Sequence, residues 1–206
     1  MATNKYILIT LFVTSLFLIK CGCKKLQIDC TQIRYNFQLP VKAYPDKDSI
    51  NIGDTLYLKI DESSILRDSI SSSNIDYSGT ENLGTVITFN KLVAVGKLEY
   101  ALDKFKISVV KGQKLKQSDI DVEYSFLEED GRFKFEIAVI PQNSGVFRII
   151  ISNSNNTYRK NDKCTKANFN IKFKDTQLHA YYYNVFDPNA VINTSNIGNV
   201  YYFKVK

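Results

Sequence analysis

The chain has 206 residues, a formal net charge of +6, four cysteines, one histidine and no tryptophan. Its length suits one domain with an N-terminal extension, and its 44% hydrophobic and 23% charged residues exclude a disordered or collagen-like chain. The single histidine, His179, excludes metal sites built from two or more histidines, and any histidine-based acid–base catalysis has to run through it.

The N-terminal segment has the pattern of an export signal. Residues 1–5 carry one lysine, and residues 6–19 are mainly apolar. This apolar run is shorter than the roughly 20 residues that a membrane-spanning helix needs. A charged start, an apolar run of about 7–15 residues and small residues after it are typical of a secretory signal. We therefore predict that residues 1–22 form a signal peptide that is removed on export.

Two cysteines, Cys21 and Cys23, follow the apolar run. A cysteine at this place resembles the lipobox of bacterial lipoproteins, in which signal peptidase II cleaves before a cysteine that carries a diacylglyceryl group. Cys21 has Leu18 at the position that the family favours but Lys20 directly before it. Cys23 has the small Gly22 before it but lacks the upstream leucine. The resemblance implies a lipid anchor at Cys23, with Cys21 as the alternative.

We expect residues 23–31 to form a lipidated tether to a bacterial envelope membrane. Acyl chains contribute about 0.8 kcal/mol per buried CH₂ to such an anchor, and Lys24 and Lys25 would add about 1 kcal/mol each beside anionic head groups. Removal of the signal takes away two lysines and no acid, so the charge falls from +6 to +4. An exported protein meets little nucleic acid, so we expect no nucleic-acid partner.

The cysteine count also favours Cys23 as the lipid site. If Cys23 is modified, Cys21 leaves with the signal, and Cys30 and Cys164 remain as an even pair, which suits an oxidising compartment. A Cys30–Cys164 disulfide would close a loop of about 134 residues, worth about 5 kcal/mol in the chain-entropy model and more often about 2–4 kcal/mol when measured. A thiol-based active site is the alternative, which the lack of a C-x-x-C spacing disfavours.

From Thr31 onward, apolar and polar residues alternate with a period of two. This pattern places one face of each strand in a core and the other in water, and it predicts a half-buried antiparallel sheet. Many short strands at regular spacing favour a β-sandwich or a barrel. The predicted strands lie near residues 33–39, 50–60, 85–95, 104–110, 121–128, 132–140, 146–152, 168–174 and 199–205.

Turn signals separate the predicted strands. Asp130-Gly131 predicts a tight hairpin, and residues 141–145 predict a second turn. Residues 153–163 are predicted to form a polar loop. Two stretches, Ser63–Ser72 and Thr176–Asn184, have apolar residues at helical offsets and could form short helices or loops.

Four fragments resemble the immunoglobulin-like lipoproteins of unknown function of Bacteroidota envelopes. They are the cysteine followed by basic residues, the strand beginning at residues 48–58, the turn and strand at residues 141–148, and the aromatic strand at residues 200–205. The resemblance implies a single immunoglobulin-like antiparallel β-sandwich over residues 32–206, with one or two short helices. It also implies the outer membrane as the address, and the lack of an acidic run after the lipid site favours the periplasmic face. No activity comes with the resemblance.

Tyrosine is abundant, with 13 residues, and three are consecutive: Tyr181, Tyr182 and Tyr183. Exposed tyrosines favour recognition, because the ring offers rigid area and a polar tip. We name these three and the neighbouring His179 as possible ligand contacts. The alternative for each tyrosine is core filling, and for His179 a surface or half-buried position among aromatic rings.

We expect no catalytic residue, cofactor or metal site in this chain. Acidic clusters such as Asp119-Ile-Asp121 are explained by solvated turn charges without invoking calcium. The favoured interpretation is a non-enzymatic binding or envelope-interaction module with an unidentified protein or glycan partner. A carbohydrate-binding accessory lipoprotein is the alternative, which an aromatic platform on a sandwich face would favour. A hydrolase that uses His179 is the third candidate.

Overall fold

A computed structural model describes residues 33–174, 179, 182, 184–185 and 198–206 of the chain. By its contacts the chain divides into a unit of residues Met1–Thr31 and a unit of residues Gln32–Lys206. The described part of the second unit is all-β, with strands β1 to β17, a short 3-10 helix, η1 (Leu102–Lys104), and a few helical residues at 179, 182 and 184–185. No helix among the described residues is long and apolar enough to cross a membrane.

The larger sheet has eight strands in the order β12-β13-β3-β1-β16-β15-β6, with β9 paired to β13. β1 and β16 run parallel, and the other pairs in this sheet are antiparallel. The strands are β1 (Ile33–Tyr44), β3 (Leu56–Ser63), β6 (Thr80–Glu81), β9 (Phe105–Lys111), β12 (Leu127–Glu129), β13 (Arg132–Pro141), β15 (Ser154–Arg159) and β16 (Asp162–Phe173).

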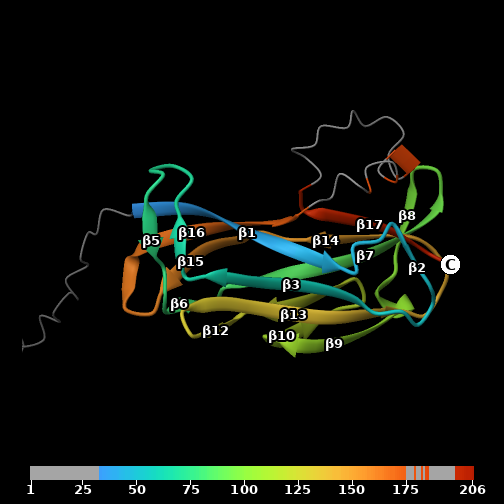
Figure 1. Cartoon of the computed structure of the whole chain (residues 1–206), viewed down its shortest axis with the longest axis horizontal. Helices are drawn as coiled ribbons and strands as arrows, with labels where there is room; N and C mark the ends of the chain where they lie inside the picture. The colour runs from blue at the N-terminus through green and yellow to red at the C-terminus, as the bar shows by residue number, and fades with distance from the viewer. Residues whose placement is uncertain (1–32, 175–178, 180–181, 183, 186–197) are drawn as a thin grey trace, which may run out of the picture. The chain divides into compact units, whose positions relative to one another are not determined.

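The second sheet has seven strands in the order β10-β11-β7-β14-β17-β2, with β8 paired to β7. β17 and β2 run parallel. Its strands are β2 (Ser49–Ile50), β7 (Gly84–Ala94), β8 (Lys97–Tyr100), β10 (Gln113–Gln117), β11 (Asp121–Ser125), β14 (Gly145–Ile151) and β17 (Val200–Val205). A separate ribbon of β4 (Ile65–Arg67) and β5 (Asn74–Asp76) lies near the start of β1 (Figure 1).

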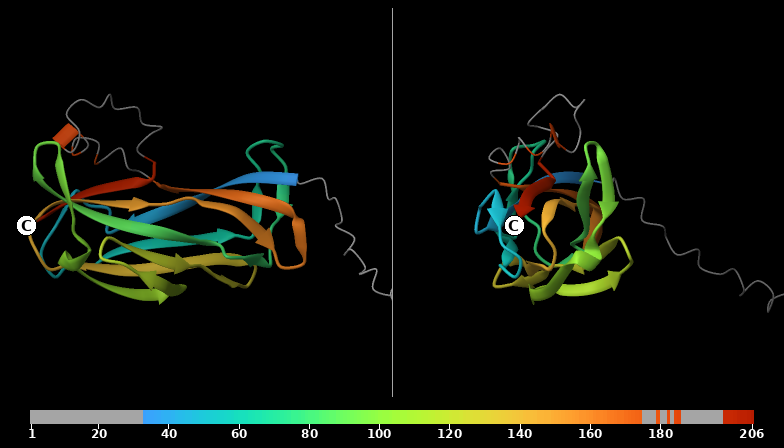
Figure 2. Two further views of the ribbon diagram at one scale, coloured as in Figure 1. Left: turned by 180° about the vertical axis from the view of Figure 1, so that it is seen from behind. Right: turned by 90° about the vertical axis from the view of Figure 1, so that its right-hand side faces the viewer.

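The core lies between the two curled sheets, whose strands surround it when seen end-on (Figure 2, right). Aromatic rings contact each other across the gap between the sheets. The ring centroids of Phe105 on β9 and Phe147 on β14 are 4.9 Å apart, and those of Tyr124 on β11 and Phe135 on β13 are 5.4 Å apart. Burial raises the pKa of Tyr124 to about 12. Phenylalanine and tyrosine therefore supply the largest buried side chains of a chain that has no tryptophan, beside a majority of aliphatic residues.

The period-two pattern predicted most of this architecture correctly. Each of the nine predicted regions contains a strand, and the all-β fold is confirmed. The hairpin at Asp130-Gly131 is also confirmed, because both residues have positive φ, 53° and 66°, and Glu129 pairs with Arg132. Positive φ at both central residues is the geometry of a type I′ turn, which matches the twist of the strands that it joins.

The sheets are mixed, and the prediction of purely antiparallel pairing was wrong. β1 pairs with β16 in parallel over nine register positions, from Ile33 opposite Thr165 to Val41 opposite Phe173. The alternation of apolar residues reports which face is buried, and it is the same for a half-buried strand of either direction. Strand direction depends on contacts between residues more than 100 positions apart, which local sequence does not contain.

The predicted helical option at Ser63–Ser72 was wrong. Residues 65–67 form β4 and pair with β5. The turn after β4 is organised by Asp68, whose carboxylate accepts hydrogen bonds from the backbone N–H groups of Asn36 at 2.8 Å and Ser71 at 2.7 Å. Aspartate and serine compete with helix formation by binding nearby backbone groups in this way. Of the second helical option, Thr176–Asn184, the structure describes residues 179, 182 and 184, and all three have helical backbone; the rest of the stretch lies outside the described residues.

The polar stretch at residues 153–163 is not a loop as predicted. It contains β15, which pairs with β16 and β6, and the first residues of β16. Thr157 is buried there and donates a hydrogen bond from Oγ1 to the carbonyl of Ala167 at 3.0 Å. Hydrogen bonds of this kind allow a buried polar side chain such as Thr157, whereas Arg159 Nε of the same strand is buried without a partner among the described residues.

Candidate functional site

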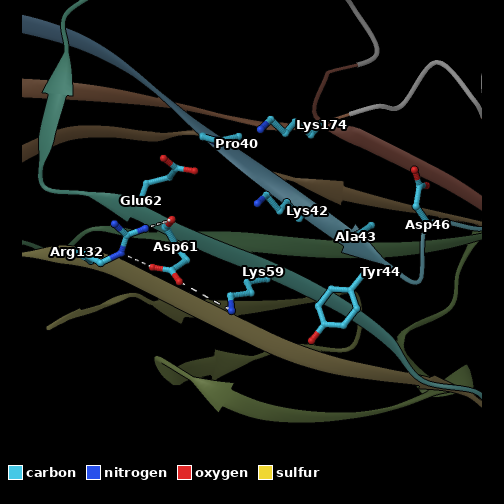
Figure 3. A pocket seen from close by; sticks show the side chains of 10 residues that line it. All are labelled: Pro40, Lys42, Ala43, Tyr44, Asp46, Lys59, Asp61, Glu62, Arg132 and Lys174. Carbon is cyan, nitrogen blue, oxygen red and sulfur yellow. Dashed lines mark hydrogen bonds and ion pairs between the residues drawn. The ribbon is translucent and has the colours of Figure 1, made fainter. Parts of the chain in front are cut away.

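A charged groove of about 610 Å³ lies on the outer face of the eight-stranded sheet (Figure 3). Pleating of the strands places its residues there. In β1, Val41 points into the core while Lys42 and Tyr44 point outward, and in β3 the same alternation exposes Lys59 and Asp61. The charged residues that line the groove are Lys42, Lys59, Arg132, Lys174, Asp46, Asp61 and Glu62.

One end of the groove is a compact ion cluster. Arg132 donates hydrogen bonds from Nε to Asp61 Oδ1 and from Nη2 to the Asp61 carbonyl oxygen, both at 2.6 Å. Lys59 Nζ lies 3.9 Å from Asp61 and 3.9 Å from Glu136. The hydrogen bond from Arg132 lowers the pKa of the Asp61 carboxyl below its ordinary value, and the same bond raises the pKa of Arg132. The acid and base groups at this end hold each other in place.

Tyr44 forms the other wall and is held at two points. Its ring stacks on Tyr57 with centroids 4.8 Å apart and planes inclined by 14°, and its hydroxyl donates a hydrogen bond to Glu136 Oε1 at 3.0 Å. Desolvation of the hydroxyl and this hydrogen bond raise the pKa of Tyr44. The side chain is still 42% exposed, so Tyr44 offers a fixed aromatic surface to a ligand.

His179 does not line the groove, although it contacts Asp46, which does. Its side chain is only 1% exposed, Nε2 lies 3.1 Å from Asp46 Oδ1, and its ring centroid lies 4.8 Å from that of Tyr201. Its Nδ1 has no hydrogen-bond partner among the described residues. The histidine is thus buried among aromatics more deeply than the sequence predicted, and it positions Asp46, which reaches the groove.

The other residues proposed as sites are distributed differently. Tyr182 is 3% exposed and packs against Tyr202, a position that favours core packing over ligand contact. Cys164 is half-buried on β16, directly before Thr165, the register partner of Ile33. The remaining candidates, Tyr181, Tyr183, Cys21, Cys23 and Cys30, lie outside the described residues. No cluster of potential metal-ligating side chains occurs in the described part of the chain.

The groove itself was missed at the sequence level. The first strand was predicted to end at residue 39, so Lys42 and Tyr44 fell outside it. The available signal was the alternation that continues through Val41, Ala43 and their polar neighbours to the end of β1. Arg132 and Lys174 could not have been found in this way, because Arg132 begins β13 and Lys174 follows β16, both distant from β1 in sequence.

Comparison with known proteins gives no match. No protein-family model, no curated protein and no solved structure matches this chain significantly. The functional argument therefore rests on the geometry of the groove.

Proposed function

We propose that this chain is a non-enzymatic binding module of a lipid-anchored envelope protein, and that the charged groove is its ligand site. The observation that carries the proposal is that Tyr44 and the charged side chains around it are held in fixed positions. They lie on β1, β3 and β13, which are adjacent strands of the eight-stranded sheet. Groups held by packing and hydrogen bonds lose little conformational freedom when a ligand binds, which favours affinity.

The chemistry of the lining supports binding more than catalysis. The acid and base groups at the Arg132 end already neutralise each other. The described lining includes no serine, cysteine or histidine that could serve as a nucleophile or general base. The buried His179 contacts Asp46 and not the groove interior, which makes a hydrolase the least supported candidate.

The proposed attachment rests on the sequence of the first 31 residues, with lipid at Cys23 or at Cys21. A tether of residues 23–31 could extend at most about 3.3–3.6 Å per residue before β1 begins at Ile33. A Cys30–Cys164 disulfide is supported by the pairing of Ile33 with Thr165, because Cys164 directly precedes Thr165 and Cys30 precedes Ile33 by three positions in the sequence. An immunoglobulin-like sandwich is supported by the successive strands β13 and β14, which lie in different sheets.

A carbohydrate-binding role is the second candidate. The observation that favours it is the Tyr44–Tyr57 pair on the outer sheet face, since the exposed ring of a fixed tyrosine can stack on a sugar. Both candidates use the same groove.

Site-specific crosslinking in intact cells tests the proposed site. A photo-crosslinking amino acid replaces Tyr44 in the groove or, as the matched control, Tyr100, an exposed tyrosine of β8 in the other sheet. We expect a discrete adduct from position 44 that position 100 does not give, and that Arg132→Glu abolishes. Equal adducts at both positions, or none at position 44, would contradict a ligand site in the groove.

A further inference from the structure

Three lysines lie side by side in the groove: Lys42 on β1, Lys59 on β3, and Lys174 directly after the end of β16. Lys42 of β1 is the register partner of Lys59 of β3. On the other side of β1, Val41 pairs with Phe173, and the backbone N–H of the next residue, Lys174, donates to the Val41 carbonyl at 2.9 Å. Because neighbouring strands are about 4.7–4.9 Å apart, the row concentrates three positive charges within a short distance.

Only one of the three lysines has acidic partners. Lys59 lies 3.9 Å from both Asp61 and Glu136. Lys42 and Lys174 form no ion pair or hydrogen bond through their ammonium groups with any described residue, and in Figure 3 both groups extend in the same direction over the groove. Like charges on directly opposite residues destabilise a sheet. The fold thus keeps a pair of uncompensated cations that an anionic ligand would neutralise.

Tyr44 adds an aromatic surface next to this pair. It lies two residues after Lys42 on the same face of β1, at a distance of about 7 Å along the strand. One face of its ring is covered by Tyr57 and its hydroxyl is held by Glu136, so its exposed part is presented in one orientation. A ligand that contacts both the lysine pair and Tyr44 therefore needs an anionic group and, about the width of one sugar ring away, a flat face that can stack on the tyrosine.

We propose that the groove binds an acidic saccharide, with a carboxylate or sulfate at Lys42 and Lys174 and a sugar ring against Tyr44. This inference rests on the proposed function and names its ligand class. Glu62 lines the groove without an ion-pair partner among the described residues, so it can accept hydrogen bonds from sugar hydroxyls and repels a second anionic group. The charge pattern therefore favours a saccharide with one acidic group at the lysine pair over a uniformly dense polyanion.

The test measures binding to the mature full-length chain by calorimetry, using a cello-oligosaccharide that carries a single terminal uronate, the neutral cello-oligosaccharide of equal length, a singly sulfated oligosaccharide, an oligogalacturonate as the dense polyanion, and inorganic sulfate. The variant is Lys42→Gln with Lys174→Gln. The matched control is Lys106→Gln with Lys116→Gln, which removes two exposed lysines from β9 and β10. Tyr44→Ala is paired with Tyr100→Ala in the same way.

We expect an acidic oligosaccharide to bind, and the groove double variant to weaken binding by about tenfold or more, which corresponds to about 1.4 kcal/mol. The lysine control and Tyr100→Ala should leave affinity nearly unchanged, while Tyr44→Ala weakens it. The unliganded groove variant should melt no lower than the wild type, because it relieves repulsion; this separates loss of binding from loss of folding.

Several results would overturn the inference. Equal losses in the groove and control variants would show general attraction of polyanions to lysines. Equal affinity for the acidic and the neutral oligosaccharide would show that the groove does not recognise an acidic group. Binding of inorganic sulfate as tight as that of the oligosaccharides, and insensitive to Tyr44→Ala, would show a simple oxyanion site. If no saccharide binds while position 44 still gives its crosslink, the ligand class is wrong but the groove remains the binding site.

Discussion

Two lysine-rich regions of this molecule differ in their place within the sheets. The lysines of β9 and β10 lie on edge strands, since β10 ends the order of the seven-stranded sheet and β9 pairs only with β13 in the described sheet. Charged lysines on an edge prevent pairing with other chains, so they have a structural purpose. Lys42 and Lys59 lie on β1 and β3, which have neighbours on both sides. No edge needs protection there, so the row of lysines in the groove calls for a functional explanation.

The largest expected effect separates the strands under the groove from the edge strand β9. Phe37 of β1 is fully buried, and its ring lies 5.3 Å from that of Phe169. Replacing Phe37 with alanine should lower the free energy of unfolding by about 3–5 kcal/mol. Val110 of β9 is 50% exposed, and Val110→Ala should change the free energy of unfolding by less than about 0.5 kcal/mol. Chemical denaturation measures both changes, and similar losses would mean that the edge strand β9 is part of the rigid core.

The second prediction compares the two ends of β1. The proposed Cys30–Cys164 disulfide would constrain the end that pairs with β16, whereas the groove lies at the end that pairs with β3. Reduction should therefore lower the free energy of unfolding by about 2–4 kcal/mol without changing ligand affinity. The double variant Cys30→Ser with Cys164→Ser should have this lower stability already and should not respond to reductant. A reductant effect that persists in the double variant would rule out this pairing.

The fold class could be predicted from the sequence because burial imposes alternation within each strand. The groove could not, and β1 illustrates the reason. Pro40 suggests the end of a strand, since proline cannot donate a ladder hydrogen bond. In the structure β1 pairs with β16 up to Val41 and with β3 only from Lys42, so Pro40 precedes the region where β3 is the neighbour. The row of lysines depends on the register of three strands that are far apart in sequence, and no local pattern specifies that register.

The third prediction is that the same change, lysine to glutamate, alters the free energy of unfolding in opposite directions in the two regions. Lys42→Glu turns the like-charged pair with Lys59 into an opposite pair, and should raise the free energy of unfolding by about 0.2–1 kcal/mol in the absence of ligand. Lys116 of β10 is the register partner of Glu123, so Lys116→Glu creates a like-charged pair. This variant should lower the free energy of unfolding by a similar amount. Thermal melts at low ionic strength measure both changes. Destabilisation by Lys42→Glu would mean that the groove lysines are already compensated.

The smallest effect concerns the compensated end of the groove. The Asp61 pKa is lowered in the folded state, chiefly by the hydrogen bond from Arg132, so the folded chain binds this proton less readily than the unfolded chain. The resulting stability is present above the unfolded pKa, near 3.8, and is lost as the pH falls through the lower folded pKa. Asp61→Asn should therefore make the melting temperature fall less steeply than in the wild type between about pH 5 and pH 3. Because both side chains are partly exposed, added salt should shrink the difference. If the two profiles remain parallel, the Arg132–Asp61 bond does not stabilise the fold, and the contrast between a neutralised end and an uncompensated end of the groove would have to rest on the lysine pair alone.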